Sequence, residues 1–156
     1  MSEKISFQGI RCTDVRLNSV WNRILKSYGV PKDSSGYIYD AITVPGGFGL
    51  RADFKWIYKK IVALAKAHGT EVVIVSAHDD CAAGGNSNEF LENVERLKDS
   101  FSNDSIECTV LGFYLQKSDD KWRPYYFESY HTHVRVIMKH CDLGYEFARE
   151  RIRWIW

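Results

Sequence analysis

Residues 71–77 read EVVIVSA, an apolar run without the polar alternation of a half-exposed strand. Uninterrupted runs of this kind are typical of strands in parallel sheets, because helices cover both faces of such a sheet. Outward from this run, the patterns of residues 4–12, 37–44 and 106–116 indicate three more strands. The sequence therefore predicts a sheet with residues 71–77 near its centre.

Helical patterns lie between these strands. A helix over residues 52–68 is indicated by apolar residues at helical spacing and by Gly69, which is a natural stop. Shorter patterns predict a helix over residues 18–29 and another that begins after Asn86, where Glu89 three residues on resembles a capping box. The alternation of strands and helices indicates an α/β fold with a mainly parallel β-sheet flanked by helices.

The C-terminal part of the chain completes the predicted architecture. Residues 122–130 are interpreted as an antiparallel edge strand that returns after the turn-like KSDDK of residues 117–121. A further strand is predicted near residues 133–138, and a last helix over residues 142–156. The sequence shows no linker-like segment, so residues 1–156 are predicted to form a single domain.

The composition is that of an ordinary globular protein, with 45% hydrophobic and 26% charged residues. A net charge of +1 provides no strong field to attract nucleic acid or an anionic membrane surface. No apolar run approaches the ~20 residues of a membrane-spanning helix, and the N-terminal MSEKISFQGIR is too polar for a signal peptide. We therefore expect a cytoplasmic protein whose 4 cysteines are thiols or metal ligands.

Chemically reactive side chains follow two of the predicted strands. Cys12, Asp14 and Arg16 stand at the end of the first strand, and His78 and Cys81 follow the apolar run. Sites in parallel sheets form beyond the carboxyl ends of the strands, so the two groups are expected to meet. Two thiolates and one imidazole are good ligands for Zn²⁺, and they leave a fourth position open.

Each motif taken alone also has a simpler interpretation. A cysteine at a strand end is usually a small buried residue, and Asp14 with Arg16 can form a surface ion pair worth about 0–1 kcal/mol. Another alternative is a thiol-based redox protein that uses Cys12 and Cys81, although thiolates bound to a metal are not free to cycle.

Together the motifs resemble those of the β-class carbonic anhydrases. Cys-x-Asp-x-Arg at residues 12–16, followed by His-x-x-Cys at residues 78–81, is similar to the zinc-site motifs of that family. The longer segments CTDVRLNSVWNRILKSYGV, HGTEVVIVSAHDDC and IECTVLGFYLQKSDDKW resemble the family in the same order, so the resemblance extends over residues 5–122. It implies a β-carbonic-anhydrase-like fold.

The resemblance also implies a role for each residue of the site. Cys12, His78 and Cys81 would bind Zn²⁺. Asp14 would pair with Arg16 in an open form of the site and would become a fourth ligand in a closed form. The implied activity is that of a zinc-dependent carbonate dehydratase, a lyase that interconverts carbon dioxide and bicarbonate through zinc-bound hydroxide.

The turn at residues 43–47 departs from the family pattern. It reads Thr-Val-Pro-Gly-Gly where the family has Arg-Asn-Ala-Gly-Gly, and Ala82 stands in place of the glycine after the second cysteine. Gly46 and Gly47 are retained, so backbone is still expected on the substrate side of the site. The altered turn motivates two alternatives. One is a zinc hydrolase of the same fold that acts on carbonyl sulfide or carbon disulfide, and the other is a non-catalytic zinc-binding homologue.

Other features suggest further contacts. His131 and His133 would share one face of the strand predicted there and are a candidate second metal site or proton shuttle. The terminal RIRWIW of residues 151–156 carries apolar side chains that a monomer rarely exposes, so a homodimer or higher homo-oligomer is expected. Asp79 and Asp80 are either solvated turn carboxylates or contacts to a metal ligand.

Overall fold

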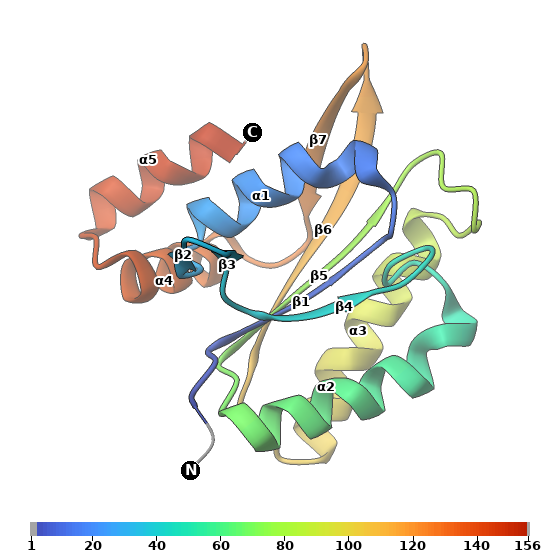
Figure 1. The fold of residues 1–156 in the computed structure, drawn as a ribbon, viewed down its shortest axis with the longest axis horizontal. Coiled ribbons are helices and arrows are strands. Elements are labelled where there is room, and N and C mark those ends of the chain that lie inside the picture. The colour runs from blue at the N-terminus through green and yellow to red at the C-terminus, as the bar shows by residue number, and fades with distance from the viewer. Residues whose placement is uncertain (1–2, 156) are drawn as a thin grey trace.

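The computed structural model describes the backbone of residues 3–155 and the side chains of residues 3–153. The expectation for the side chains of Trp154, Ile155 and Trp156 lies outside the described residues. The helices and strands follow one another along the chain as Figure 1 shows. The strands are β1 (Phe7–Arg11), β2 (Lys32–Asp33), β3 (Gly36–Tyr37), β4 (Asp40–Thr43), β5 (Val72–His78), β6 (Thr109–Ser118) and β7 (Lys121–Tyr126). The helices are α1 (Asn18–Ser27), α2 (Phe54–His68), α3 (Ser87–Asn103), α4 (Tyr130–Cys141) and α5 (Tyr145–Ile155), with short 3-10 turns η1 (Val15–Leu17) and η2 (Arg51–Asp53).

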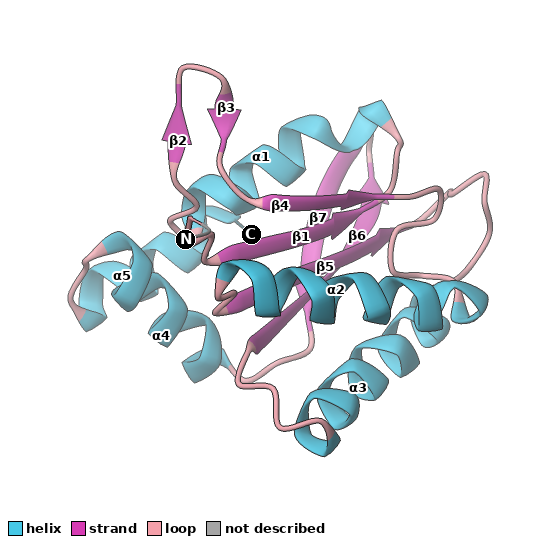
Figure 2. Cartoon of the chain, turned by 60° about the horizontal axis from the view of Figure 1, so that its bottom comes forward, coloured by secondary structure: helices cyan, strands magenta, loops and turns pink. Residues whose placement is uncertain are grey.

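Five strands form one sheet in the order β4-β1-β5-β6-β7 (Figure 2). The first four of these are mutually parallel, and β7 runs antiparallel to β6 at the edge. This confirms the predicted α/β fold with a mainly parallel sheet and an antiparallel edge strand. From β1 the sheet extends to β4 on one side and to β5 on the other, so the strand order reverses between β1 and β5. Open α/β sheets bind ligands at such a reversal, beyond the carboxyl ends of the strands.

The apolar strand β5 is buried at every residue. Val72 and Ile74 pack against α1, α4 and α5 on one face of the sheet, and Val73 and Val75 pack against α2 and α3 on the other. Burial of each such side chain contributes about 1.5–3 kcal/mol. The two helical layers are visible on opposite sides of the sheet in Figure 1, and they explain why this strand lacks polar alternation.

The predicted ends of α2 and α3 are confirmed. Gly69 ends α2 in the left-handed conformation, with φ of 69°. The side chain of Asn86 accepts a hydrogen bond from the backbone N–H of Glu89 over 2.9 Å, which satisfies one of the free donors at the start of α3. These local signals are strong because they depend on neighbouring residues only.

The predicted strand near residues 133–138 is wrong, because this segment lies in α4. The side chain of Ser129 caps the helix by accepting from the backbone N–H of Thr132. His133, Val134 and Ile137 are buried together at helical spacing, so the branched side chains that suggested a strand pack as one face of a helix. The last helix begins at Tyr145 rather than at residue 142, since Asp142 ends α4 in the left-handed conformation.

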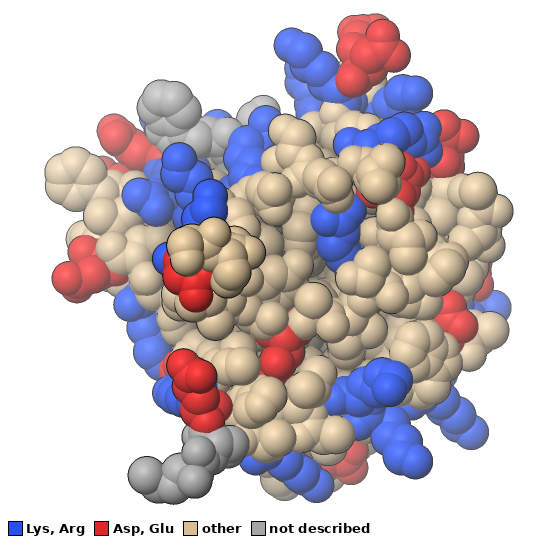
Figure 3. Space-filling model, viewed as in Figure 1, with Lys and Arg blue, Asp and Glu red and all other residues tan. Residues whose placement is uncertain are grey.

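Both signs of charge are spread over the face of the molecule in Figure 3, in keeping with the net charge of +1. Among the residues that the structure describes, none of the helices combines the length and the apolar character required to cross a membrane.

Candidate metal centre

Three potential metal ligands meet at the carboxyl ends of β1 and β5. Cys12 directly follows β1, His78 is the last residue of β5, and Cys81 lies in the loop after it. Because Ile10 and Val75 pair in parallel register, the two strands end at the same edge of the sheet. The donor atoms of the three side chains all lie within 4.8 Å of one another, and the two sulfur atoms are 3.8 Å apart without a disulfide.

The ring of His78 is oriented to offer one nitrogen. Its Nδ1 lies 2.6 Å from the carbonyl oxygen of Asp79, which can only accept, so Nδ1 carries the proton. In the neutral ring this leaves the lone pair on Nε2, and Nε2 is buried without a hydrogen-bond partner among the described residues. A buried imidazole nitrogen without a partner, beside two thiols, is the arrangement that a metal ion would satisfy.

The surroundings of the Cys12 and Cys81 sulfur atoms also suit metal binding. The backbone N–H of Gly46 donates to Sγ of Cys12 over 3.3 Å, a contact that stabilises a thiolate. Burial and the neighbouring Cys12 raise the pKa of Cys81, so two thiolates in this position call for a compensating cation. A donor set of two sulfurs and one nitrogen suits Zn²⁺, which binds these ligands in a tetrahedral arrangement.

The backbone of the turn at Gly46 and Gly47 packs closely beside the three potential metal ligands. The φ angles of these two glycines, 89° and 56°, lie in the left-handed region, where side chains other than hydrogen are disfavoured. A Cβ atom at Gly47 would stand 2.5 Å from the carbonyl oxygen of Ser76 and 3.0 Å from the backbone nitrogen of Cys12. The turn therefore packs between the ends of β1 and β5 only because these positions are glycine.

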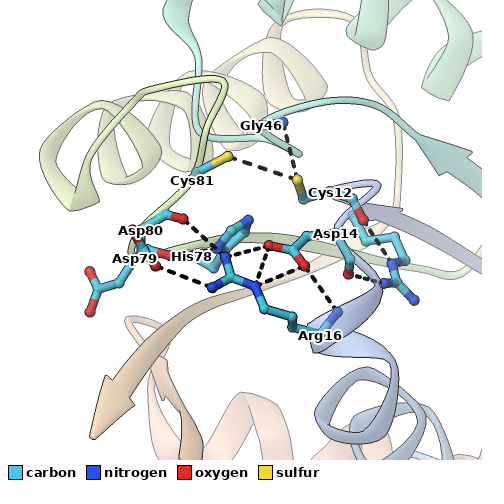
Figure 4. A network of polar contacts seen from close by, with 9 residues as sticks. Cys12, Asp14, Arg16, Gly46, His78, Asp79, Asp80 and Cys81 are labelled. Carbon is cyan, nitrogen blue, oxygen red and sulfur yellow. Dashed lines mark hydrogen bonds and ion pairs between the residues drawn. The ribbon is translucent and has the colours of Figure 1, made fainter. Parts of the chain in front are cut away.

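Asp14 and Arg16 form a bidentate ion pair beside the potential metal ligands (Figure 4). Nε and Nη2 of Arg16 donate to Oδ2 of Asp14 over 3.0 and 2.6 Å, and the backbone N–H of Arg16 donates to Oδ1 over 2.9 Å. The hydrogen bonds from Arg16 lower the pKa of Asp14 to about 2. Asp14 is thus an ionised acceptor at neutral pH.

The sequence left the roles of Asp79 and Asp80 open, and the structure gives both specific contacts. The carboxylate of Asp79 accepts from the hydroxyl of Tyr114 and the backbone N–H of Lys117, and its carbonyl orients His78. The carboxylate of Asp80 accepts from Nη1 of Arg16 over 3.1 Å. The contacts with Tyr114, Lys117 and Arg16 do not follow from spacing, because each joins residues far apart in the chain.

Trp122 is a neighbour of the site that sequence analysis missed. Its ring lies edge-on to that of His78, with centroids 5.5 Å apart, and the guanidinium of Arg16 lies 5.5 Å from the Trp122 ring. The signal that could have found it is the hairpin of β6 and β7, which carries this residue back toward the carboxyl end of β5.

His131 and His133 do not join a second metal site. His131 is exposed on α4, whereas His133 is fully buried and bonded to Tyr28 and Glu128. Within the described part of the chain, Cys12, His78 and Cys81 are the group whose donor atoms converge closely enough to hold an ion.

Comparison with known protein families gives a match that covers most of the chain. Residues 2–128 match the sequence model of a family described as "Putative carbonic anhydrase". No curated protein matches the sequence. The matched segment ends before α4, so α4 and α5 lie outside it.

Three solved structures are similar to this chain at low identity. A carbonic anhydrase from Streptococcus mutans is 14% identical, with a TM-score of 0.47 over 79% of this chain and 82% of that one. A carbonic anhydrase from Glaciozyma antarctica is 15% identical, with a TM-score of 0.48 over 80% and 83%. The apo form of a carbon disulfide hydrolase is 14% identical, with a TM-score of 0.46 over 74% and 76%. On the strength of the match over residues 2–128, the chain belongs to the carbonic anhydrase family that its paired motifs resemble.

Proposed function

We propose that this protein is a zinc-dependent carbonate dehydratase that interconverts carbon dioxide and bicarbonate. The observation that carries the proposal is the convergence of Cys12, His78 and Cys81 on one point. An ionised Asp14, held by Arg16, lies beside that point. Membership of a carbonic anhydrase family supports the same activity.

The three converging side chains would hold the metal. Bound there, zinc would supply Lewis-acid chemistry, which lowers the pKa of a water ligand. Two thiolates and a neutral imidazole carry two negative charges between them, so they offset the charge of the ion. The carbonyl of Asp79 keeps Nε2 of His78 directed at the centre, and the N–H of Gly46 supports Cys12.

Asp14 would orient the reacting water. Its oxygens remain acceptors because the hydrogen bonds from Arg16 hold its pKa at about 2, so it does not retain the proton released in hydration. An acceptor fixed in this way aligns a water molecule for attack on carbon dioxide at little entropic cost. The backbone of Gly46 and Gly47 would form the wall on the substrate side.

A second candidate is a hydrolase of the same fold that acts on carbonyl sulfide or carbon disulfide. The turn before Gly46 carries Val44 and Pro45, and the Val44 side chain is buried. Neither residue offers a side-chain hydrogen-bond donor from this turn, which favours a substrate that is less polar than bicarbonate. A panel of carbon dioxide, carbonyl sulfide and carbon disulfide separates the two candidates.

We extend the proposal to assembly and location. Phe147 and Tyr145 on α5 are 67% and 43% exposed, which supports contact with a second copy of the chain. The cysteines of the described residues are all free, which supports a reducing compartment such as the cytoplasm.

Metal content tests the proposal directly. Purified wild-type protein is expected to contain about one zinc per chain, since three protein ligands are present. Cys81→Ser should lose most of the metal, because it removes a thiolate donor. Cys108→Ser is the matched control, since the Cys108 thiol donates to the carbonyl of Thr70 and is not part of the cluster.

Activity is then measured on the zinc-loaded protein by stopped-flow hydration of carbon dioxide. Catalysis that Cys81→Ser abolishes and Cys108→Ser retains is the expected result. Protein that holds zinc yet never accelerates hydration, even at alkaline pH, would contradict the proposed activity. Turnover of carbon disulfide or carbonyl sulfide by that protein would identify the second candidate, and inactivity on the whole panel a non-catalytic zinc protein.

A further inference from the structure

The guanidinium of Arg16 is held from two sides. Asp14 binds it through Nε and Nη2, whereas Asp80 binds it from the other side through its carboxylate and its carbonyl oxygen, each over 3.1 Å. Four of the five N–H groups of the guanidinium are thereby engaged. Figure 4 shows Arg16 between the two aspartates, with His78 behind.

We propose that Asp80 and Trp122 are positioning residues that fix Arg16 and, through it, keep Asp14 away from the metal. The inference rests on the proposed function, because it concerns access to the same metal centre. Asp80 and Trp122 lie outside the Cys-x-Asp-x-Arg motif, yet they would help to decide whether Asp14 pairs with Arg16 or binds the metal.

Asp80 is built into the turn that carries the ligands. It lies between His78 and Cys81, and its φ of 55° places it in the left-handed region that aspartate tolerates better than most residues. This conformation directs both its carbonyl and its carboxylate to Arg16. The position of Arg16 is therefore tied to the backbone that presents two of the three potential ligands.

Trp122 supports Arg16 from a different element. It stands near the start of β7, opposite Lys117 of β6, and its ring contacts both His78 and the guanidinium. The negative face of an aromatic ring attracts a guanidinium that lies over it. The Trp122 ring packs against both His78 and Arg16. Arg16 therefore cannot move away without losing its contact with this ring.

These contacts bear on Asp14, the fourth ligand that the family resemblance implies for a closed form of the site. Its carboxylate accepts from the backbone N–H, Nε and Nη2 of Arg16, and it can coordinate an ion only by giving up some of these bonds. Contacts that hold Arg16 in place favour the state in which Asp14 stays paired. Removal of the Asp80 or Trp122 contact is expected to shift the population toward the state in which Asp14 coordinates the metal.

The test uses Co²⁺ in place of zinc, because its visible absorption reports the ligands directly. Azide is titrated into the cobalt-loaded wild type and Asp80→Gly, a variant that keeps the left-handed backbone and the carbonyl contact. Asp14 competes with azide for the metal more often in the variant, so the apparent Kd for azide should rise about two- to fivefold, the range expected for an exposed ion pair. Asp80→Asn, whose amide oxygen still accepts from Nη1, should restore most of the affinity, and Trp122→Leu should weaken it in the same direction as Asp80→Gly.

Asp120→Asn is the charge-matched control. Asp120 lines the same surface hollow as Arg16 and also has a positive φ, but it makes no hydrogen bond to Arg16. It should bind azide as the wild type does. Wild-type affinity in Asp80→Gly, or an equal loss in Asp120→Asn, would overturn the positioning role while the metal centre stands. Failure of the wild type to bind Co²⁺ or zinc at all would instead overturn the proposed function on which the inference rests.

Discussion

At the scale of single residues, the site depends on positions where only one kind of side chain fits. Gly47 is the clearest example, because its left-handed φ and its contacts with Ser76 and Cys12 exclude a Cβ atom on two grounds. The first ground is conformational, and the second is a collision with backbone of β5 and of the residue that follows β1. Backbone cannot move aside as a flexible side chain can, so the second cost adds to the first.

Gly47→Ala is therefore expected to lower the free energy of unfolding by about 3 kcal/mol, from left-handed strain of about 1–2 kcal/mol and the added collision. Gly69→Ala separates the two terms. Gly69 has a similar φ of 69°, but a Cβ there would meet nothing closer than 3.9 Å. It should therefore cost only the left-handed strain of about 1–2 kcal/mol. Urea denaturation measures both, and equal losses would show that the close approach of Gly47 is not a constraint.

At the scale of elements, α4 is anchored by a buried polar network. Nε2 of His133 donates to Glu128 over 3.2 Å, and Nδ1 accepts from the hydroxyl of Tyr28 over 2.6 Å, so one neutral tautomer satisfies both partners. Tyr28 and His133 are fully buried, and Tyr28 caps the end of α1. Burial raises the pKa of Tyr28, which keeps its hydroxyl a donor. The network joins α4 to the part of the chain that matches the family.

Tyr28→Phe should destabilise the protein by about 1–3 kcal/mol, because it leaves Nδ1 of His133 buried without a partner. Tyr58→Phe is the matched control. The hydroxyl of Tyr58 also bonds to two groups, the Ser100 carbonyl and Asp104, but these partners lie nearer the surface and can turn to water. The control should lose less than about 1 kcal/mol in thermal and urea denaturation. If both variants lose the same amount, burial of the His133 network contributes nothing specific.

At the scale of the whole molecule, Glu71 connects three distant segments. It precedes β5 at the end of the sheet opposite the metal centre, and it pairs with Lys139 of α4 and, over 3.1 Å, with Lys4 before β1. The hydrogen bond from Lys139 and that from Lys4 lower its pKa from 4.5 to about 2. A carboxylate with a depressed pKa stabilises the folded state above its unfolded pKa, and this stabilisation is lost as the pH falls through the folded value.

Glu71→Gln should accordingly lower the free energy of unfolding at pH 7, by about 1 kcal/mol or less for a pair at the surface. The difference from wild type should shrink as the pH falls below 4.5 and disappear only below pH 2, where Glu71 becomes protonated in both states. Chemical denaturation at a series of pH values measures it. Glu107→Gln removes a carboxylate that has no ion pair among the described residues and should show no such trend. A difference for Glu71→Gln that persists unchanged at pH 2 would contradict the role of its charge.

Much of the fold follows from local patterns. The apolar run at residues 72–77, the glycine after α2 and the Asn86 cap each act through neighbouring residues, so their outcomes do not depend on the rest of the chain. The misassigned α4 shows the limit of such patterns. Val134, Val136 and Ile137 favour a strand by intrinsic preference, but the Ser129 cap and burial against α1 and α5 decide for a helix.

The parallel sheet and the pairing of Cys12, Asp14 and Arg16 with His78 and Cys81 follow from the amino-acid sequence, because strand ends in such a sheet share one edge. How these groups are held in place follows from the tertiary structure. Backbone dihedrals in the turn after β5 let the carbonyl of Asp79 orient His78 and let Asp80 bind Arg16. Trp122 reaches His78 because the hairpin of β6 and β7 carries it there. Side-chain direction in a turn is set by φ and ψ, and contact between distant segments is set by packing, neither of which spacing along the chain specifies.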